Sequence, residues 1–373
     1  MIYFDNAATG GFKIRAVTDA AETVIRYLSA NPGRSGHRLS LTGAKIANDT
    51  RTVISEYFGS SADRVIFTKN CTEALNVAIF GSVKKGGHII TTVFEHNSVL
   101  RPLFALKNSG AVTLDVVAPE RGKDILCAIK EKITPDTYLI ATTSASNVTG
   151  EELPIKKIGE LAQEHGLLYL VDGAQGGGHM PLNVKEQNIS FLALAGHKGL
   201  NGIMGSGVLI LNDDADLAPL IFGGTGSESF NLNQPQCYPE RLESGTLNLP
   251  AVAALCEGVR HVKNNAQFRE HLFSMTEYMI NGLNKIPNAT VYSASNGTGI
   301  VSFSLGGIES AEVADILNSE FDVAVRGGFH CAPLMHKYLR TDGDGLVRAS
   351  LAVQNSTREI NFFLRAVEKI SNR

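Results

Sequence analysis

The sequence has 373 residues, of which 43% are hydrophobic and 19% are charged, and its formal net charge is −3. This balance is typical of a folded globular protein, and the length indicates two or three domains, of which we expect two. The chain has no block of lysine and arginine and no run of about 20 apolar residues, so nothing in it indicates a nucleic-acid or membrane partner. The N-terminus does not resemble a signal peptide, and the cytoplasm is the expected location.

The cysteines exclude two further classes of protein. There are five of them, an odd number, at positions 71, 127, 237, 256 and 331. No CxxC pair occurs, and their spacing does not resemble that of a zinc site. We therefore expect five free thiols, with neither a disulfide framework nor a metal centre.

The first two thirds of the chain alternate between short apolar runs and longer helical patterns. A helix is expected first, at 17–28, where apolar residues recur at helical spacing. The expected strands that follow are 64–68, 88–94, 112–117, 137–145, 167–172 and 208–211. The expected helices between them are 72–80, 124–133 and 155–166. This alternation predicts βαβ units and a mainly parallel sheet that is covered on both faces.

After about residue 250 the pattern changes. The expected elements are a long helical stretch from 251 to about 285, a strand at 299–305, a helix at 310–321 and strands at 323–326 and 346–352. Ser356 and Glu359 have the spacing of a capping box and mark the start of the last helix. We therefore expect a large domain over 16–250 and a small α+β domain over 251–373, with residues 1–15 belonging to the small domain.

Polar residues follow several of these strands, at the edge where an open parallel sheet binds its ligands. Strand 64–68 runs into Cys71 and Thr72 as a helix begins, so backbone N–H groups and a hydroxyl would face a ligand such as phosphate. An ordinary helix N-cap is the simpler interpretation of this segment taken alone. Strand 167–172 ends at Asp172, whose carboxylate could cap a turn or pair with a cationic ring nitrogen.

Lys198 follows the apolar run 189–196. Such surroundings remove water from the amine and favour its neutral, nucleophilic form, which a lysine needs to form an imine. A lysine on an exposed loop is the alternative. A phosphate cradle, a carboxylate for a ring nitrogen and an imine-forming lysine together describe a site for pyridoxal 5′-phosphate, although none of the three is specific by itself.

Nine short segments, in order along nearly the whole chain, carry a family resemblance. They are DNAAT (5–9), NCTEALN (70–76), EHNSVLRP (95–102), SNVTGE (146–151), VDGAQ (171–175), GHK (196–198), ESGTLN (243–248), RGGFHCAPL (326–334) and VRASLAVQN (347–355). They resemble the motifs of class V aminotransferase-fold enzymes, in particular cysteine desulfurases and selenocysteine lyases. The resemblance implies the PLP-dependent transferase fold type I, with a large domain whose mainly parallel, seven-stranded sheet lies between helices, and a smaller C-terminal α+β domain.

The same resemblance implies roles for residues around the cofactor ring. Lys198 would bind pyridoxal 5′-phosphate covalently, Asp172 would pair with its ring nitrogen, and His96 would stack on the ring. Gln175 and Asn147 would lie near the phenolic oxygen and the substrate.

The phosphate and the substrate also have implied partners. Thr72, the backbone of Cys71 and His197 would hold the phosphate, with Thr246 contributed by the second subunit of a homodimer. The substrate carboxylate is assigned to another pair of residues. Arg348 would bind it, with help from Arg326.

Cys331 decides the expected reaction. It lies in a segment with glycines and a proline, which is typical of an exposed loop, and His330 and Arg326 beside it could favour its thiolate. The resemblance implies that Cys331 accepts the sulfur of L-cysteine as a persulfide and that alanine is released, with selenocysteine as a second candidate substrate. A sulfur-acceptor protein is then an expected partner.

Two other functions stay open at this level. An aminotransferase or a β-carbon lyase with the same cofactor and fold would leave Cys331 without a catalytic role. A nucleotide-binding module is disfavoured, because the runs GGTGSES and GAQGGG match neither a dinucleotide fingerprint nor a P-loop. Two residues depart from the family pattern: Ala195 stands where many relatives have Ser or Thr, and Ser144 stands where His is common.

Overall fold

A seven-stranded sheet forms the centre of the computed structural model, which describes residues 1–120 and 124–373. The strand order is β2-β8-β7-β6-β5-β3-β4. The strands are β2 (Val65–Thr68), β3 (His88–Thr92), β4 (Thr113–Val117), β5 (Thr137–Thr143), β6 (Leu168–Asp172), β7 (Phe191–Ala195) and β8 (Gly207–Leu211). β8 pairs antiparallel with β2 and β7, and all other pairs in this sheet are parallel. The predicted mainly parallel sheet is confirmed.

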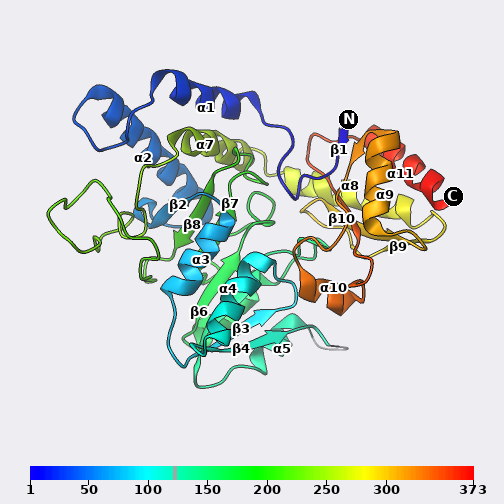
Figure 1. Ribbon diagram of the computed structural model, residues 1–373, viewed down its shortest axis with the longest axis horizontal. Helices are drawn as coiled ribbons and strands as arrows, with labels where there is room; N and C mark the ends of the chain where they lie inside the picture. Colours follow the sequence, from blue (N-terminus) through cyan, green and yellow to red (C-terminus); the bar gives the residue numbers. More distant parts are fainter. Residues whose placement is uncertain (121–123) are drawn as a thin grey trace.

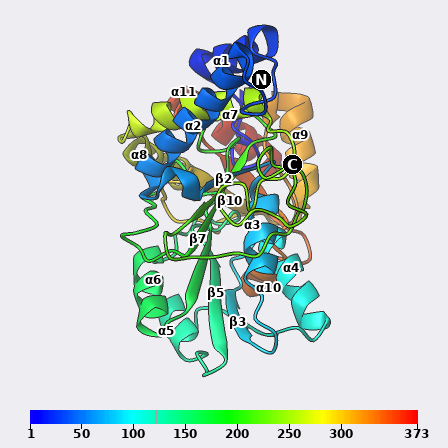
Figure 2. The same cartoon turned by 90° about the vertical axis from the view of Figure 1, so that its left-hand side faces the viewer.

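Helices cover both faces of this sheet. Those of one face are α3 (Cys71–Gly81) and α4 (Asn97–Asn108), and those of the other are α2 (Arg38–Phe58), α5 (Ile125–Lys130), α6 (Ile155–Glu164) and α7 (Leu249–Lys263). Figure 2 shows α5 and α6 on one side of the strands and α3 and α4 on the other. Strands β5 and β7 are buried along their whole length, as expected for strands with helices on both sides.

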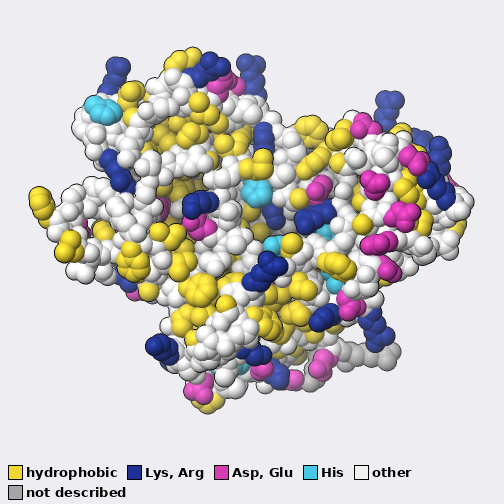
Figure 3. All heavy atoms as spheres, in the orientation of Figure 1, with side chains coloured by type: hydrophobic (Ala, Val, Ile, Leu, Met, Phe, Trp, Pro, Cys, Tyr) yellow, Lys and Arg dark blue, Asp and Glu magenta, His cyan; other side chains and the backbone are white. Residues whose placement is uncertain are grey.

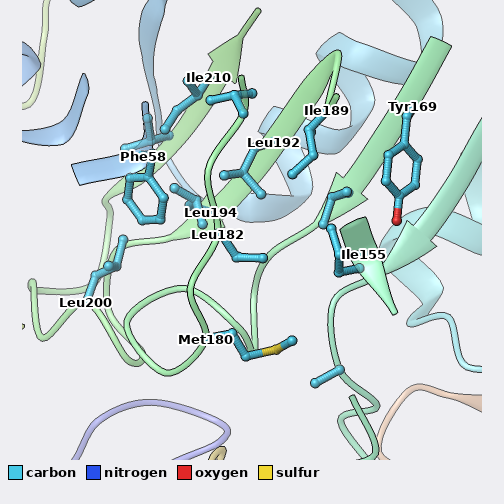
Figure 4. Close-up of a cluster of buried hydrophobic side chains, with 14 of the residues drawn as sticks. Phe58, Ile155, Tyr169, Met180, Leu182, Ile189, Leu192, Leu194, Leu200 and Ile210 are labelled. Carbon is cyan, nitrogen blue, oxygen red and sulfur yellow. The ribbon is translucent and has the colours of Figure 1, made fainter. Parts of the chain in front are cut away.

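The hydrophobic core between the sheet and one helical layer is drawn in Figure 4. Leu192 and Leu194 of β7 point to the same face and meet Ile155 of α6 and Phe58 of α2 in one cluster of buried side chains. Burying an aliphatic or aromatic side chain of this size contributes about 1.5–3 kcal/mol. Tyr169 satisfies its buried hydroxyl by a hydrogen bond of 2.9 Å with Thr142.

A second, smaller body lies beside the large sheet, on the right of Figure 1. Its elements are an antiparallel sheet of order β12-β10-β9, formed by β12 (Val347–Ser350), β10 (Ile300–Leu305) and β9 (Ala289–Val291), with helices α8 (Phe268–Leu283), α9 (Ser310–Phe321) and α11 (Thr357–Ser371). The first strand, β1 (Ile2–Tyr3), pairs with β11 (Val323–Ala324), and Phe4 packs on Phe363 of α11. Both chain termini therefore lie on this body (Figure 1).

The helical stretch expected from 251 to about 285 consists of two helices, α7 and α8. They pack on different bodies: α7 lies against α1 (Arg15–Tyr27) and α2, whereas α8 lies against α11 and β10. The proposed domain limits at residues 15 and 250 stay a prediction, and the packing of α7 favours a second limit after Lys263.

Sequence patterns did not predict three of the described helices, α2, α4 and α10 (Pro333–Leu339). The buried face of α2 includes Gly43, Ala47 and Thr50, so its apolar period is weak. Helix α4 contains Pro102 and is capped by a histidine, and both features depart from the usual helix signals. The predicted capping box of Ser356 and Glu359 is present at the start of α11. Among the described residues, no helix is both long and apolar enough to cross a membrane.

Candidate active site

The carboxyl ends of the parallel strands meet at one edge of the large sheet, and a cavity lies there. Each of β2, β3, β5, β6 and β7 sends a loop into it. The predicted site residues that line this cavity are Cys71, Thr72, His96, Asn147, Asp172, Gln175, His197 and Lys198. The geometry of parallel strands thus brings together side chains that are more than a hundred residues apart in the sequence.

Lys198 follows β7 and is partly buried in the cavity wall. Burial lowers the pKa of its amine, Asp172 partly opposes this, and Arg348 lowers the pKa further. The loop that carries it is tied to the N-terminal segment, because the His197 carbonyl accepts hydrogen bonds from the Gly10 N–H (2.9 Å) and from Lys13 Nζ (3.0 Å). The amine therefore has a defined position and an increased neutral fraction.

Asp172 ends β6 and is 3% exposed. Its Oδ1 accepts hydrogen bonds from the Ala174 N–H at 2.9 Å and from the Cys71 thiol at 3.4 Å. Burial and then the charge of Asp172 raise the pKa of Cys71 well above its usual value, so this thiol stays protonated and donates. Both contacts fall on Oδ1, which leaves Oδ2 for a ligand in the cavity.

The start of α3 has the features of an anion site. Asn70 caps this helix, and its Oδ1 accepts a hydrogen bond from the Glu73 N–H at 2.9 Å. The N–H groups of Cys71 and Thr72 lie in the first turn, where a helix has no partners of its own for them. The Thr72 hydroxyl lies 2.8 Å from the hydroxyl of Ser98.

His96 caps α4, and this contact sets its tautomer. Its Nδ1 accepts a hydrogen bond from the Ser98 N–H at 3.0 Å and lies 2.9 Å from Ser98 Oγ. A neutral ring whose Nδ1 accepts must carry its proton on Nε2. Burial lowers the pKa of His96 to about 4, so the ring is neutral near pH 7. Ser98 was not predicted, although it lies inside the quoted segment 95–102.

His197 and Gln175 are held by the N-terminal segment. Thr9 Oγ1 lies 3.1 Å from His197 Nδ1, and burial lowers the pKa of His197 to about 4. Gln175 Nε2 donates to the Ala7 carbonyl at 3.1 Å. Thr9 and Ala7 are the residues that sequence reasoning missed here, and the segment DNAAT was the only signal for them.

Arg348 is 1% exposed and is held from two sides. Its Nη1 donates to the Asn147 carbonyl at 2.9 Å, and its Nη2 forms an ion pair of 3.1 Å with Asp5. Asp5 was not predicted as the partner of this arginine. The contact links residues that are 343 positions apart, and no local pattern reveals it.

Cys331 is exposed on the loop between β11 and α10, and all five cysteines are free. Its Sγ lies 4.0 Å from Arg326 Nη2, which makes Arg326 the neighbouring cation. A positive charge on His330 was one expected reason for a stable Cys331 thiolate, and this expectation is wrong. Burial lowers the pKa of His330 to about 2, so the ring is neutral, and its Nε2 lies 3.2 Å from the Arg326 carbonyl.

The structure does not bring Thr246 to this cavity. It lines a separate depression with Lys69 and Asn248, so its role at the phosphate of a second subunit stays a prediction.

Ser144, one of the two departures from the family pattern, binds two backbone groups. Its hydroxyl donates to the Asp172 carbonyl (3.0 Å) and accepts from the Gly176 N–H (3.1 Å). Ala195, the other departure, ends β7 in the cavity wall.

Glu95 is a further acidic group close to the cavity that was not predicted. It is fully buried, and its Oε1 accepts a hydrogen bond of 2.6 Å from Thr92. Its Oε2 has no hydrogen-bond partner among the described residues. Burial raises the pKa of Glu95 to about 8, so this carboxyl is largely protonated near neutral pH.

Over residues 1–120 and 124–373, no cluster of His, Cys, Asp and Glu could hold a metal ion.

Comparison with known proteins agrees with this geometry. The family described as Aminotransferase class-V matches residues 2–363, and the chain belongs to this family. Two similar proteins are both described as probable cysteine desulfurases. A probable cysteine desulfurase from Pyrococcus abyssi is 33% identical over 99% of this chain and 94% of its own length. A probable cysteine desulfurase from Methanothermobacter thermautotrophicus is 30% identical, again over 99% and 94%.

Solved structures lead to the same group. The apo structure of a cysteine desulfurase from Thermococcus onnurineus has a TM-score of 0.92 and 31% identity, and the match covers 100% of this chain and 94% of that one. A cysteine desulfurase from Escherichia coli has a TM-score of 0.88 at 24% identity, with 98% and 94% coverage, and supports the fold. Within the class V family, the chain is thus a member of the cysteine desulfurase group.

Proposed function

We propose that this protein is a pyridoxal 5′-phosphate-dependent cysteine desulfurase that converts L-cysteine to L-alanine and transfers the sulfur to Cys331 as a persulfide. The observation that carries this proposal is a free, exposed thiol on a loop that is anchored to the cavity of Lys198 and Asp172. An aminotransferase or a β-carbon lyase would not need a thiol at this place. The relatives named above are all described as cysteine desulfurases, which favours the same choice.

The polar groups of the cavity fit the proposed cofactor. The start of α3 offers N–H groups and the Thr72 hydroxyl to a phosphate. Asp172, with Oδ2 unused, offers a buried carboxylate to a protonated ring nitrogen. Asn147 Oδ1 is buried without a partner among the described residues, which indicates that a ligand donor belongs there. When bound, the cofactor would stabilise the negative charge that forms on the substrate Cα.

The side chains then have separate tasks. Arg348 binds the substrate carboxylate, and Arg326 assists it. Lys198 Nζ, whose neutral form is favoured by burial, takes the Cα proton of bound cysteine, and His96 or Lys198 later returns a proton. The Cys331 thiolate attacks the substrate sulfur and forms an S–S bond while the C–S bond breaks. The electron pair of that bond stays on the three-carbon fragment, which gains protons and leaves as alanine.

Further parts of the proposal concern partners. A homodimer would let Thr246 of a second copy reach the phosphate, and a sulfur-acceptor protein would remove the persulfide sulfur from Cys331. Selenocysteine is a second candidate substrate, because the same groups would act on its selenium. The cytoplasmic location expected from the sequence stays a prediction.

A product assay tests the reaction. Full-length protein loaded with pyridoxal 5′-phosphate is incubated with L-cysteine and dithiothreitol, and we expect alanine and sulfide in equal amounts. Cys331→Ala should lower sulfide formation from cysteine by at least about a hundredfold, since it removes the nucleophile. The control is Cys237→Ala, which removes another exposed free thiol and should leave the rate unchanged. Equal rates in Cys331→Ala and the parent, or a keto acid in place of alanine, would overturn the proposal.

A further inference from the structure

We propose that Asn147 is a positioning residue for Cys331, whose side-chain amide holds the loop 326–332 against the cavity wall. This role differs from that of a ligand for the cofactor or the substrate. The inference rests on the proposed function only for the importance of Cys331, since the contact itself is a property of the folded chain.

The contact is short and buried. Asn147 Nδ2 donates a hydrogen bond of 2.6 Å to the carbonyl of His330, the residue before Cys331. Asn147 is 7% exposed, and a carbonyl can only be faced by the amide nitrogen, so the orientation of the amide is determined. Arg348 binds the backbone carbonyl of Asn147 at 2.9 Å and fixes the residue from the other side.

The backbone of the loop needs such anchors. His330 has φ +50° and Cys331 has φ +58°, so two consecutive residues other than glycine lie in the left-handed region. Conformations of this kind persist where the surroundings hold them, and they are frequent at functional sites. A second anchor acts on the next carbonyl, because Cys331 O accepts a hydrogen bond of 2.7 Å from the Asn97 N–H. Asn147, in the loop after β5, and Asn97, the first residue of α4, therefore hold two adjacent peptide groups.

The same side chain also contributes to the cavity wall. Asn147 lines the cavity, and its Oδ1 is the buried acceptor without a partner among the described residues. One planar group therefore contacts the thiol-bearing loop through Nδ2 and offers Oδ1 to a bound ligand. The position of the Cys331 backbone is in this way tied to the wall of the cavity in which the substrate would lie.

Hydrogen exchange measures the anchoring without any need for activity. The variants are Asn147→Ala and Asn147→Asp; the second keeps the shape of the side chain and removes the donor, so it serves if truncation unfolds the chain. In full-length protein, we expect the Ala332 amide, which donates to Phe329 O, and the Asn97 amide to exchange about tenfold faster than in the parent. Peptides from β5 and α6 should exchange at the parent's rate and show that the fold is intact.

Gln175→Ala is the matched control. Gln175 also lines the cavity, but its amide binds Ala7 O and not the loop, so exchange at Asn97 and Ala332 should equal that of the parent. Rates at these amides within twofold of the parent in both Asn147 variants would overturn the inference, and so would an equal acceleration in Gln175→Ala. Neither outcome depends on turnover, so a failure of the desulfurase proposal would be seen separately, in the product assay.

Discussion

Two buried carboxyl groups, Asp172 and Glu95, lie close together and have different surroundings. Two donors bind Oδ1 of Asp172, whereas Oδ2 accepts no hydrogen bond from the described residues. Thr92 donates a hydrogen bond to Oε1 of Glu95, and Oε2 lies in none of the hydrogen bonds among the described residues. Burial raises the pKa of Glu95 to about 8, and the charge of Asp172 adds to this effect. Protonation of Glu95 thus keeps a second negative charge away from Asp172.

The raised pKa of Glu95 predicts how the free energy of unfolding depends on pH. A carboxyl whose pKa is about 8 in the folded protein and 4.5 when unperturbed stabilises the fold fully below pH 4.5 and loses this stability as the pH rises to about 8. Glu95→Gln removes this titration. The unfolding free energy of Glu95→Gln minus that of the parent should therefore increase between pH 4.5 and about 8. The increase should be on the order of a few kcal/mol, and the difference should stay constant at higher pH. Urea unfolding at about pH 5, 6.5 and 8.5 measures this, and a constant difference at all three would contradict it.

Residues predicted from the sequence and residues that were missed differ in one respect. Lys198 and Asp172 directly follow apolar strands, so their place at the ligand edge could be derived locally. Asp5 matters because it pairs with Arg348, and Ser98 matters because its hydroxyl lies near Thr72 and its backbone holds His96. These roles depend on partners that are distant in the sequence, or on the orientation of a ring, and a single sequence does not show either.

Among the elements, α4 contributes to the site through its N-terminus. Three consecutive residues act there: His96 faces the cavity, the Asn97 N–H holds the Cys331 carbonyl, and Ser98 holds the His96 ring. A helix N-terminus supplies unpaired N–H groups, and here one of them serves another loop instead of a ligand. Sequence patterns did not predict this helix, so its position at the cavity came from the structure alone.

Helix α11 allows a test of an element that was predicted correctly. Ser356 Oγ accepts a hydrogen bond from the Glu359 N–H at 3.3 Å, and Glu359 Oε2 accepts one from the Ser356 N–H at 2.6 Å. Ser356→Ala removes the first of these bonds and should lower the unfolding free energy by about 1 kcal/mol in urea. Thr357→Ala, at the next position, which is also exposed, is the control and should lower the unfolding free energy by less. A loss in Ser356→Ala no larger than that of the control would show that the cap contributes nothing.

For the molecule as a whole, large apolar side chains are exposed on the long segment between β8 and α7. This loop projects on the left of Figure 1, and hydrophobic side chains lie at its tip in Figure 3. Phe230 and Leu232 are 103% and 101% exposed, and Phe222 is 70% exposed. Apolar groups gathered in this way mark contact surfaces, and a second copy of the chain is the partner that the proposed role of Thr246 requires.

The double variant Phe230→Lys with Leu232→Lys tests this contact. We expect the parent to be a dimer in sedimentation velocity and the variant to dissociate at least tenfold more readily, because two charges would replace apolar groups that the dimer contact buries. The affinity for pyridoxal 5′-phosphate, followed by fluorescence, should fall in parallel if Thr246 reaches the phosphate of a second subunit. Phe362→Lys, which charges an exposed aromatic position on α11, is the control. A monomeric parent, or a variant that dimerises as well as the parent, would refute the dimer.

Local patterns in the sequence were enough to predict the class of fold, from the alternation of apolar strands and helices, and to place Thr72, Asp172 and Lys198 at the ligand edge of the sheet. The other predicted residues of the cavity, His96, Asn147, Gln175 and His197, were implied by the resemblance to class V enzymes. Three features are visible only in the folded structure: Asp5 pairs with Arg348, the His330 ring is neutral, and Asn147 binds the loop of Cys331. They depend on burial and on contacts between segments far apart in the chain, and neither of these leaves a periodic pattern among neighbouring residues.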